Sequence, residues 1–342
     1  MSLSEHRGSK RLRTLDLFHG AGGSSYGAKK AGVEIVAGID QWQVAGQAYQ
    51  QNFPEAKVFT DDITSLSADR LRAAIGEIDL LLASPECTNH TCAKGGGERS
   101  EESKMTAFQV VKFAKAFRPR WIIVENVVQM KSWSRHPELL EKLWELGYYV
   151  KEEKLNAADF GVPQSRKRLF LLCSLTGEAS APAIIDQPYM PASSIISSAS
   201  DYRFTPLYNE RRAKATIERA ERAISQLGMN EPFLIVYYGS DGSGGWQTLD
   251  RPLRTVTTLD RFAYVKPATT GHMMRMLQPE ELKLAMGFDK EYQLGVGSRR
   301  DKIKLMGNAV CPPVMESIVR ALCYALPPLQ PGNKRIRGEL SD

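Results

Sequence analysis

The sequence predicts an α/β fold with a mostly parallel sheet, and two observations lead to this prediction. Short apolar segments alternate with segments of helical period along the first half of the 342-residue chain. Several apolar segments end in a glycine-rich or acidic turn, which is where open α/β sheets bind ligands. The length of the chain allows two domains, or one large domain with an insertion.

Apolar content and turn residues define each strand expected in this sheet. The apolar residues after Asp79 predict a buried strand that stops at Ser84-Pro85, because proline cannot continue a central ladder. The expected strands are Arg13–Phe18, Val33–Ile39, Lys57–Phe59, the segment after Asp79, Arg120–Val124, Tyr148–Leu155 and Leu169–Cys173.

The helices expected between these strands end at stop signals such as Gly32 and the Phe53-Pro54 pair. They cover the residues from the first glycine-rich turn to about Ala31, Gln41–Asn52, Ala68–Ile75, Met105–Phe117 and Pro137–Leu146.

The composition changes at Gly177, and the residues up to about Ser200 are rich in Ala, Ser, Pro and Ile without a clear period. This pattern predicts an irregular segment. The elements expected after it are a basic helix at Arg211–Leu227, a strand at Phe233–Tyr238, and helices at Pro279–Met286, Lys302–Leu305 and Pro312 to about Leu326.

The bulk composition excludes several classes of protein. Hydrophobic content of 42% and charged content of 25% are ordinary for a globular protein, and no apolar run approaches the ~20 residues of a membrane span. The N-terminal residues show no signal peptide, and the five cysteines are scattered without a CxxC pair. We therefore expect a cytoplasmic protein without disulfides or zinc. A net charge of +6 is compatible with a polyanionic partner.

Two turns carry candidate chemistry. Cys87 follows the strand after Asp79, where a thiol either packs inertly or acts as a nucleophile. The segment Asp16-Leu-Phe-His-Gly-Ala-Gly-Gly23 first suggests a dinucleotide-binding turn. It fails that test, because the third glycine of the fingerprint would fall at Ser25.

The order of short motifs along nearly the whole chain resembles the cytosine C5 DNA methyltransferase family. Each motif is weak alone, and the six in family order are specific. They are Asp16–Gly23, Asp61-Asp-Ile63, Pro85-Glu-Cys87, Glu125-Asn-Val127, Gln164-Ser-Arg-Lys-Arg168 and Gly307-Asn-Ala-Val310.

This resemblance implies roles for the catalytic residues. Cys87 would attack C6 of cytosine, which makes C5 nucleophilic. Glu125 would protonate N3, and for this we expect burial to raise its pKa. Arg168 would hold the O2 oxygen of the base, and Arg166 would support a phosphate or a loop. Taken singly, Glu125 also fits a solvated carboxylate, and the arginines fit an exposed basic turn.

The resemblance also implies S-adenosylmethionine as the cofactor, in a Rossmann-like methyltransferase fold with a seven-stranded type of sheet. Asp40 would accept hydrogen bonds from the ribose hydroxyls, Asp62 and Ile63 would meet the adenine, and Phe18 would lie against it. No metal is expected. The residues expected to bind the cofactor are Phe18, Gly20, Gly22, Gly23, Asp40, Asp62, Ile63, Pro85, Asn308 and Ala309.

The implied domain organisation follows the motifs. Residues 12–176 would form the catalytic and cofactor-binding domain, residues 177–272 a small target-recognition region, and residues 273–327 a segment that returns to the catalytic domain. Residues 1–11 and 328–342 would be tails. The target base would be flipped out of duplex DNA, with the glycine loop Gly95–Gly97 closing over it while Lys94 and Arg99 meet phosphate.

The expected biological setting is a bacterial or phage enzyme that acts as a monomer on double-stranded DNA, with a cognate restriction endonuclease as an optional partner. Three alternatives remain at this point. They are the same chemistry on tRNA, a catalytically silent DNA-binding relative, and a nicotinamide-dependent oxidoreductase.

The chain departs from the family pattern at two places. Glu86 and Thr88 flank Cys87 where the family has proline and glutamine, and Gln41 stands where an aromatic residue often follows the ribose-binding acid. Trp42 comes one position later. A carboxylate beside the thiol should disfavour the thiolate, which affects the rate more than the type of reaction.

Overall fold

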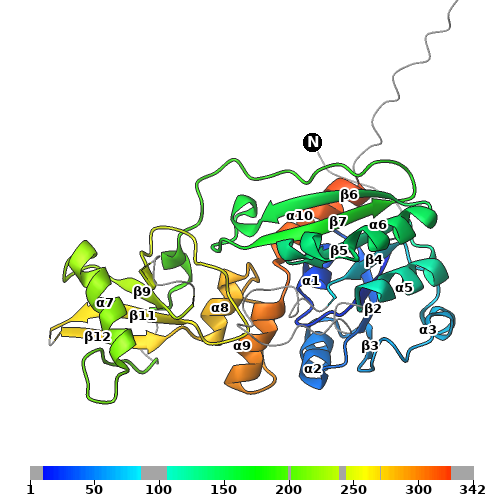
Figure 1. The fold of residues 1–342 in the computed structure, drawn as a ribbon. Helices are drawn as coiled ribbons and strands as arrows, with labels where there is room; N and C mark the ends of the chain where they lie inside the picture. Colours follow the sequence, from blue (N-terminus) through cyan, green and yellow to red (C-terminus); the bar gives the residue numbers. More distant parts are fainter. Residues whose placement is uncertain (1–10, 86–105, 199–201, 239–243, 270, 325–342) are drawn as a thin grey trace, which may run out of the picture.

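A computed structural model describes residues 11–85, 106–198, 202–238, 244–269 and 271–324. The catalytic candidate Cys87, its neighbour Glu86 and the Gly95–Gly97 loop with Lys94 and Arg99 therefore lie outside the described residues. The described chain contains a seven-stranded sheet, a five-stranded sheet and the helices that cover them (Figure 1).

The seven-stranded sheet has the strand order β3-β2-β1-β4-β5-β7-β6. All pairs are parallel except those of β7, which runs antiparallel to both β5 and β6. This arrangement confirms the expected mostly parallel α/β fold. Its strands are β1 (Arg13–Leu17), β2 (Glu34–Ile39), β3 (Lys57–Phe59), β4 (Leu80–Ala83), β5 (Trp121–Asn126), β6 (Tyr149–Asn156) and β7 (Lys167–Ser174).

Helices cover both faces of this sheet, because side chains alternate between the faces along each strand. Leu80 and Leu82 of β4 face a core shared with α1 (Gly23–Lys30), α2 (Gln43–Asn52) and α10 (Pro312–Cys323). Leu81 and Ala83 face the opposite core. That second core is closed by α3 (Ala68–Ile75), α5 (Gln109–Phe117) and α6 (His136–Glu145).

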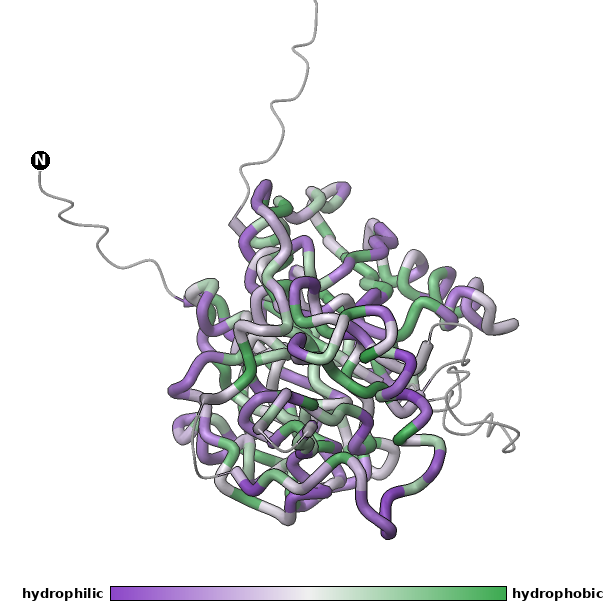
Figure 2. Tube along the Cα trace, turned by 90° about the vertical axis from the view of Figure 1, so that its left-hand side faces the viewer, coloured by the Kyte–Doolittle hydropathy of each residue, from purple (hydrophilic) through white to green (hydrophobic). Residues whose placement is uncertain are grey.

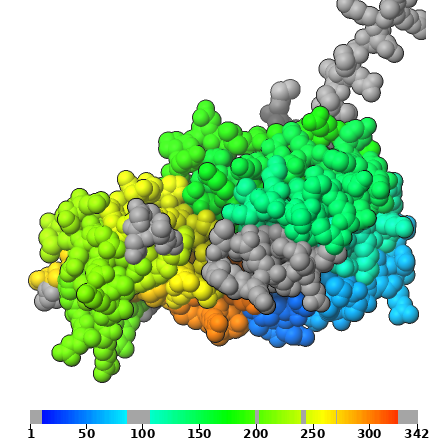
Figure 3. Space-filling view, viewed as in Figure 1, coloured from blue at the N-terminus to red at the C-terminus, as the bar shows by residue number. Residues whose placement is uncertain are grey.

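The five-stranded sheet is antiparallel and has the order β10-β9-β11-β12-β8. It forms one end of the molecule, on the left in Figures 1 and 3, with α7 (Lys214–Leu227) packed on it. Its strands are β8 (Thr205–Pro206), β9 (Phe233–Val236), β10 (Trp246–Gln247), β11 (Phe262–Ala268) and β12 (Gly271–Met276).

The β11–β12 hairpin was missed by the sequence prediction, which assigned no strand between Gly245 and Met274. Charged and cyclic residues such as Lys266, Pro267 and Arg275 interrupt the apolar pattern of these strands. They are strands because they pair with each other and with β9 and β8, which are distant in sequence. β12 also runs across residue 272, where a boundary was expected.

The C-terminal segment returns to the seven-stranded sheet. Helix α8 (Pro279–Ala285) is followed by α9 (Arg299–Asn308), which is longer than expected because Ser298 and Asp301 form a capping box at its start. Helix α10 then packs against α1 so closely that a Cβ on Gly27 would lie 2.2 Å from the Pro312 carbonyl oxygen. Many of the outer loops in Figure 2 are hydrophilic, whereas the two cores are apolar.

Candidate active site

A cavity of about 450 Å³ opens at the carboxyl ends of the parallel strands. Its volume lies in the range of small-molecule sites, and its position is the ligand-binding edge of open α/β sheets. Eight of the fourteen residues predicted for the site line it: Phe18, Gly20, Asp40, Asp62, Ile63, Pro85, Glu125 and Asn308.

The turn after β1 forms one wall of the cavity and needs left-handed backbone at several positions. Phe18, a non-glycine residue, has φ 61°, and Gly20 and Gly22 have φ 53° and 73°. A Cβ on Gly20 would have no heavy atom within 4 Å, so a ligand can approach the backbone there. This turn therefore presents main chain to the cavity.

Gly22, Gly23 and Ala309, which we expected to contact the cofactor, do not line the cavity. A Cβ on Gly22 would lie 2.7 Å from the Phe53 ring, and one on Gly23 would lie 2.1 Å from the Val310 carbonyl oxygen. The missing side chains let the glycine turn pack closely against α2 and against the turn between α9 and α10. These residues therefore support the cavity wall by packing and do not face the cavity.

Asp40 lies at the end of β2 and is anchored by the backbone. The Gly20 N–H donates to Oδ2 and the Trp42 N–H donates to Oδ1, both at 2.9 Å. Each carboxylate oxygen can still accept a second hydrogen bond. The carboxylate is thus held in place in a form that two neighbouring hydroxyl groups of a ligand can reach.

Asp62 and Ile63 form the wall that follows β3. The Thr64 N–H and hydroxyl donate to Asp62 Oδ1 at 2.9 and 2.8 Å, and these hydrogen bonds lower the pKa of the Asp62 carboxyl. The Ile63 side chain is buried. The pair offers an ionised acceptor beside an apolar surface.

Pro85 lies at the end of β4, directly before the undescribed residues. Asn126 at the end of β5 donates its amide to the Pro85 carbonyl at 3.2 Å, and the Ser84 N–H donates to the Leu17 carbonyl at 3.1 Å. The last described residues before Cys87 are therefore fixed to the neighbouring strands β5 and β1.

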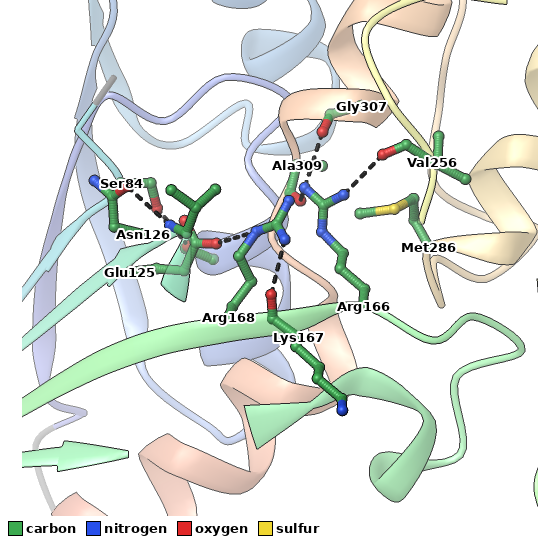
Figure 4. Close-up of polar contacts among 12 residues, drawn as sticks. Ser84, Glu125, Asn126, Arg166, Lys167, Arg168, Val256, Met286, Gly307 and Ala309 are labelled. Carbon is green, nitrogen blue, oxygen red and sulfur yellow. Dashed lines mark hydrogen bonds and ion pairs between the residues drawn. The ribbon is translucent and has the colours of Figure 1, made fainter. Parts of the chain in front are cut away.

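Glu125 and Arg168 face each other from β5 and β7, as Figure 4 shows. Arg168 Nε lies 3.1 Å from Glu125 Oε1, and the carboxyl side chain is 9% exposed. Burial raises the pKa of Glu125, although Arg168 and then Arg166 oppose the rise. The direction of the predicted shift is confirmed, and its cause is loss of solvation.

Arg166 is buried and contacts backbone from distant parts of the chain. Its guanidinium donates to the carbonyls of Val256 at 2.9 Å, Gly307 at 2.8 Å and Ala309 at 3.2 Å (Figure 4). These contacts favour the expected support of a loop over contact with a phosphate. Gln164 acts similarly: Val256 N–H donates to it at 2.8 Å, and it donates to the Ala285 carbonyl at 2.9 Å.

The sequence prediction missed two positively charged side chains that α9 contributes to the cavity wall. Arg300 and Lys304 line the cavity together with the predicted Asn308. The spacing of four residues places these side chains on one face of a helix, which is a signal that the sequence contains. Lys304 Nζ lies 4.2 Å from the centre of the Trp42 ring, so the cation covers the aromatic residue at the cavity wall.

A buried polar cluster beneath the glycine turn was also missed. The Ser25 hydroxyl lies 2.7 Å from both Asp16 Oδ2 and the Tyr49 hydroxyl. Burial raises the pKa of Asp16 to about 7. The signal in the sequence for this buried cluster was the carboxylic acid Asp16 within the apolar pattern of β1. Ser25, which occupies the third-glycine position, is thereby part of the support of the turn.

No described part of the chain brings together three or more His, Cys, Asp or Glu side chains that could hold a metal ion. Among the described helices, none is both long enough and apolar enough to cross a membrane.

The larger sheet is mostly parallel with β7 antiparallel, and a ligand-sized cavity lies at its carboxyl edge. Together with the appended second sheet, these features define the class of Rossmann-like methyltransferases. The family model described as C-5 cytosine-specific DNA methylase matches residues 12–323. The chain belongs to this family, and it is a DNA cytosine-5 methyltransferase.

Individual relatives agree with this assignment. The chain is 28% identical over 312 residues to the type II methyltransferase M.HgiDI of Herpetosiphon aurantiacus, covering 87% of this chain and 90% of the relative. It is 33% identical over 193 residues to the type II methyltransferase M.DdeI of Desulfomicrobium norvegicum, covering 55% and 45%. The solved structure of the Entamoeba histolytica methyltransferase EhMeth has the same fold, with a TM-score of 0.66, 17% identity and coverage of 92% and 98%.

Proposed function

We propose that the protein transfers a methyl group from S-adenosylmethionine to C5 of a cytosine flipped out of duplex DNA, through a covalent bond between Cys87 and C6. One observation carries the proposal: Glu125, paired with Arg168 at 3.1 Å, lines the same cavity as Asp40 and Phe18. An acid suited to protonate a base therefore borders the space suited to a nucleoside-containing cofactor.

The cavity fits S-adenosylmethionine in several respects. Asp40, held by two backbone N–H groups, suits the ribose hydroxyls, and the open backbone at Gly20 suits the close approach of the methionine part. Asp62, Ile63 and Phe18, which line the same cavity, suit the adenine. A nicotinamide dinucleotide fits less well, because the third glycine of its fingerprint is replaced by the buried Ser25. When bound, S-adenosylmethionine supplies an electrophilic methyl group.

The residues of this chain would prepare cytosine to accept that group. The Cys87 thiolate adds to C6, while Glu125 donates a proton to N3 and so relieves the negative charge that would develop on the ring. Arg168 holds Glu125, and we expect it also to donate to the O2 oxygen of the base. After methylation, loss of the C5 proton to a base and departure of the Cys87 sulfur restore the C5–C6 double bond, and N3 returns its proton to Glu125.

The five-stranded sheet with α7 is the proposed target-recognition region. Arg219 and Arg222 lie on α7, where Arg219 covers the ring of Tyr237 and Arg222 Nε donates to the Gly244 carbonyl at 3.2 Å. The guanidinium groups of these two arginines suit the DNA backbone, and arginine suits guanine edges in the major groove. We further propose a monomer in the cytoplasm of a bacterium or of a phage-infected cell, with a restriction endonuclease as an optional partner.

Sequencing of bisulfite-treated DNA tests the proposed substrate. Expression in cells that lack cytosine methylation should leave one short sequence motif methylated, and Cys87→Ala should abolish this signal. The matched control is Cys323→Ala, because Cys323 lies at the end of α10, away from the cavity residues. Methylation of tRNA without methylation of duplex DNA would replace DNA by RNA as the substrate.

A trapping experiment tests the covalent step. A duplex that contains 5-fluorocytosine at the identified site should form an adduct that survives denaturing electrophoresis, because fluorine at C5 cannot leave as a proton does. Adduct formation should need both S-adenosylmethionine and Cys87. Turnover on the ordinary duplex without any adduct on the fluorinated duplex would contradict the mechanism.

A further inference from the structure

The loop between β3 and α3, residues 60–67, carries the cavity residues Asp61, Asp62 and Ile63 but has no regular structure of its own. Asp62 and Ile63 lie at the start of a short turn, and α3 begins only at Ala68. Within the loop, the Thr64 N–H and hydroxyl and the Ser65 hydroxyl all donate to Asp62. These local bonds shape the turn but do not attach it to the rest of the protein.

Two contacts make that attachment: the buried Ile63 side chain packs in the core closed by α3 and α5, and Lys112 of α5 binds the backbone of the loop. Its ammonium group donates to the carbonyl of Leu66 at 2.6 Å, of Thr64 at 3.3 Å and of Ile63 at 3.5 Å. A lysine ammonium has three N–H donors, so these carbonyls of one turn can use its full capacity. Charge-assisted bonds of this kind are stronger than those between neutral groups. α5 packs against α3, so the lysine stem spans a contact that already exists.

We propose that Lys112 is a positioning residue for cofactor binding, which holds the Asp62–Ile63 wall of the cavity in the conformation that receives adenine. Lys112 itself does not line the cavity, so its effect must pass through the loop. The inference rests on the proposed function, because it takes S-adenosylmethionine as the ligand of this cavity.

The electrostatics of Asp62 supports this role. The positive charge of Lys112 is one of the causes that lower the pKa of the Asp62 carboxyl, after the hydrogen bonds from Thr64. Both Thr64 bonds go to Oδ1, so Oδ2 can accept a hydrogen bond from a ligand amino group. Lys112 therefore keeps the loop in place and adds to the effect of the Thr64 hydrogen bonds that lower the pKa of the Asp62 carboxyl.

The position of Lys112 also suggests why it matters to the whole site. α5 follows residues 86–105, which include Cys87, by a short turn at Thr106–Phe108. The same helix thus connects in sequence to the proposed nucleophile and in space to the proposed adenine wall. Through its contacts with the loop, Lys112 can affect cofactor affinity without taking part in the chemical step.

The test compares Lys112→Met with Lys115→Met in the full-length protein. Both residues are on α5, but Lys115 is exposed and makes no hydrogen bond to the loop among the described contacts. We expect Lys112→Met to raise both the KM for S-adenosylmethionine and the Kd for S-adenosylhomocysteine about tenfold, roughly the effect of losing one charge-assisted hydrogen bond. kcat at saturating cofactor should change less than about twofold, because the variant leaves the groups proposed for the chemical step, Cys87 and Glu125, unchanged.

Two further variants separate positioning from a general structural effect. Lys112→Arg keeps the charge and the N–H donors, so it should restore much of the affinity. Lys112→Met should raise the Kd for S-adenosylhomocysteine by a smaller factor in the Asp62→Ala variant than in the wild type, because both changes act through one loop. Should Lys112→Met fail to fold, Lys112→Gln takes its place, since it removes the charge and shortens the side chain but keeps a polar amide with N–H donors.

The outcomes separate this inference from the proposed function. Wild-type protein that does not bind S-adenosylhomocysteine would overturn both. Wild-type binding that Asp62→Ala weakens and Lys112→Met leaves unchanged would overturn the role of Lys112 alone. A lower Tm for Lys112→Met with an unchanged Kd, or an effect fully additive with Asp62→Ala, would also overturn it.

Discussion

At Glu125, burial and two guanidinium groups act on the same carboxyl in opposite directions. Burial is the larger influence, and the pKa is raised although Arg168 lies 3.1 Å away. An isolated buried carboxyl would stay protonated, and a fully paired one would stay ionised. The intermediate arrangement suits a group that must give a proton to a base and take it back.

The first prediction concerns Glu125→Gln. Glutamine keeps the shape and can donate an N–H, but it cannot transfer a proton, so kcat should fall by about 10²–10⁴-fold with a small change in KM for DNA. The wild-type kcat should also decline as pH rises past the raised pKa of Glu125, and the variant should lack this decline. Single-turnover rates across pH measure both; an unchanged pH profile in the variant would remove Glu125 from the proton transfer.

Asp16 is the second residue whose environment controls its proton. It is fully buried beneath the glycine turn, and burial raises its pKa from 3.8 to about 7 despite its hydrogen bond from Ser25. Between pH 4 and 7 the folded protein therefore holds a proton that the unfolded chain has released. The free energy of unfolding must fall as pH rises through this window.

The second prediction follows from this sign. Asp16→Asn has no such titration, and its amide oxygen can still accept from Ser25. Relative to wild type, the variant should gain stability between pH 4 and 7, by up to roughly 4 kcal/mol at 1.36 kcal/mol per pKa unit. Urea unfolding at several pH values measures the difference. A difference that does not vary with pH would show that Asp16 is ionised in the folded state.

At the scale of elements, the cofactor wall depends on close approaches between turns. A Cβ on Gly23 would meet the Val310 carbonyl, and a Cβ on Gly307 would lie 2.3 Å from the Thr257 carbonyl carbon. Both contacts are with backbone, which cannot rotate away as a flexible side chain can. The end of α9 and the turn that follows it are thus packed between the glycine turn and the segment that carries Thr257.

The third prediction is that Gly307→Ala displaces Asn308 and the Thr257 segment. KM for S-adenosylmethionine should rise, and stability should fall by about 1–3 kcal/mol, the usual range for overpacking. Gly295→Ala is the control, because its nearest neighbour would be the end of the Gln51 side chain at 3.4 Å. Thermal unfolding and cofactor titration of both variants provide the comparison; equal behaviour would argue against the packing role.

At the scale of the whole molecule, the two sheets share one core. Leu234 and Val236 of β9 belong to the core that contains α1, α2 and α10, whereas Phe233 and Ile235 pack on the opposite face against α7. The period of two along β9 thus serves both sides of the five-stranded sheet. The proposed recognition region is therefore joined to the catalytic part by apolar packing as well as by the chain.

A buried ion pair lies at this junction. Arg275 of β12 and Glu281 of α8 form a bidentate pair at 2.6 and 2.7 Å, and both side chains are 2% exposed. Glu281 also accepts from the backbone N–H groups of Ser197 and Gln278, both at 2.8 Å. The carboxylate thereby connects the five-stranded sheet, the irregular segment before it and the first helix after it.

The fourth prediction uses this pair. Glu281→Gln leaves the Arg275 charge buried and uncompensated, so the free energy of unfolding should fall by about 3–5 kcal/mol. Glu218→Gln is the matched control, since Glu218 pairs with Lys214 on the exposed face of α7 and should matter little. Urea unfolding of the two variants tests the contrast; similar small losses would mean that solvent reaches the junction.

Local patterns were sufficient for the parallel sheet and most of its helices. Buried strands such as β4 and amphipathic helices such as α5 satisfy their hydrogen bonds and bury their apolar faces in a way that nearby residues specify. The β11–β12 hairpin could not be predicted in this way. Its strands contain polar residues, and only pairing with β9 and β8 makes them strands.

The sequence by itself determined the family, the order of the motifs and the residue types that the chemistry needs. The tertiary structure alone decided which of these residues face the cavity: Gly20 does, whereas Gly22 and Gly23 pack behind it, and Arg166 binds backbone carbonyls from distant segments. It also added Arg300, Lys304 and the Lys112 contact. The physical reason is that a side chain's type is local, whereas its neighbours, burial and proton affinity come from segments that meet only in the folded chain.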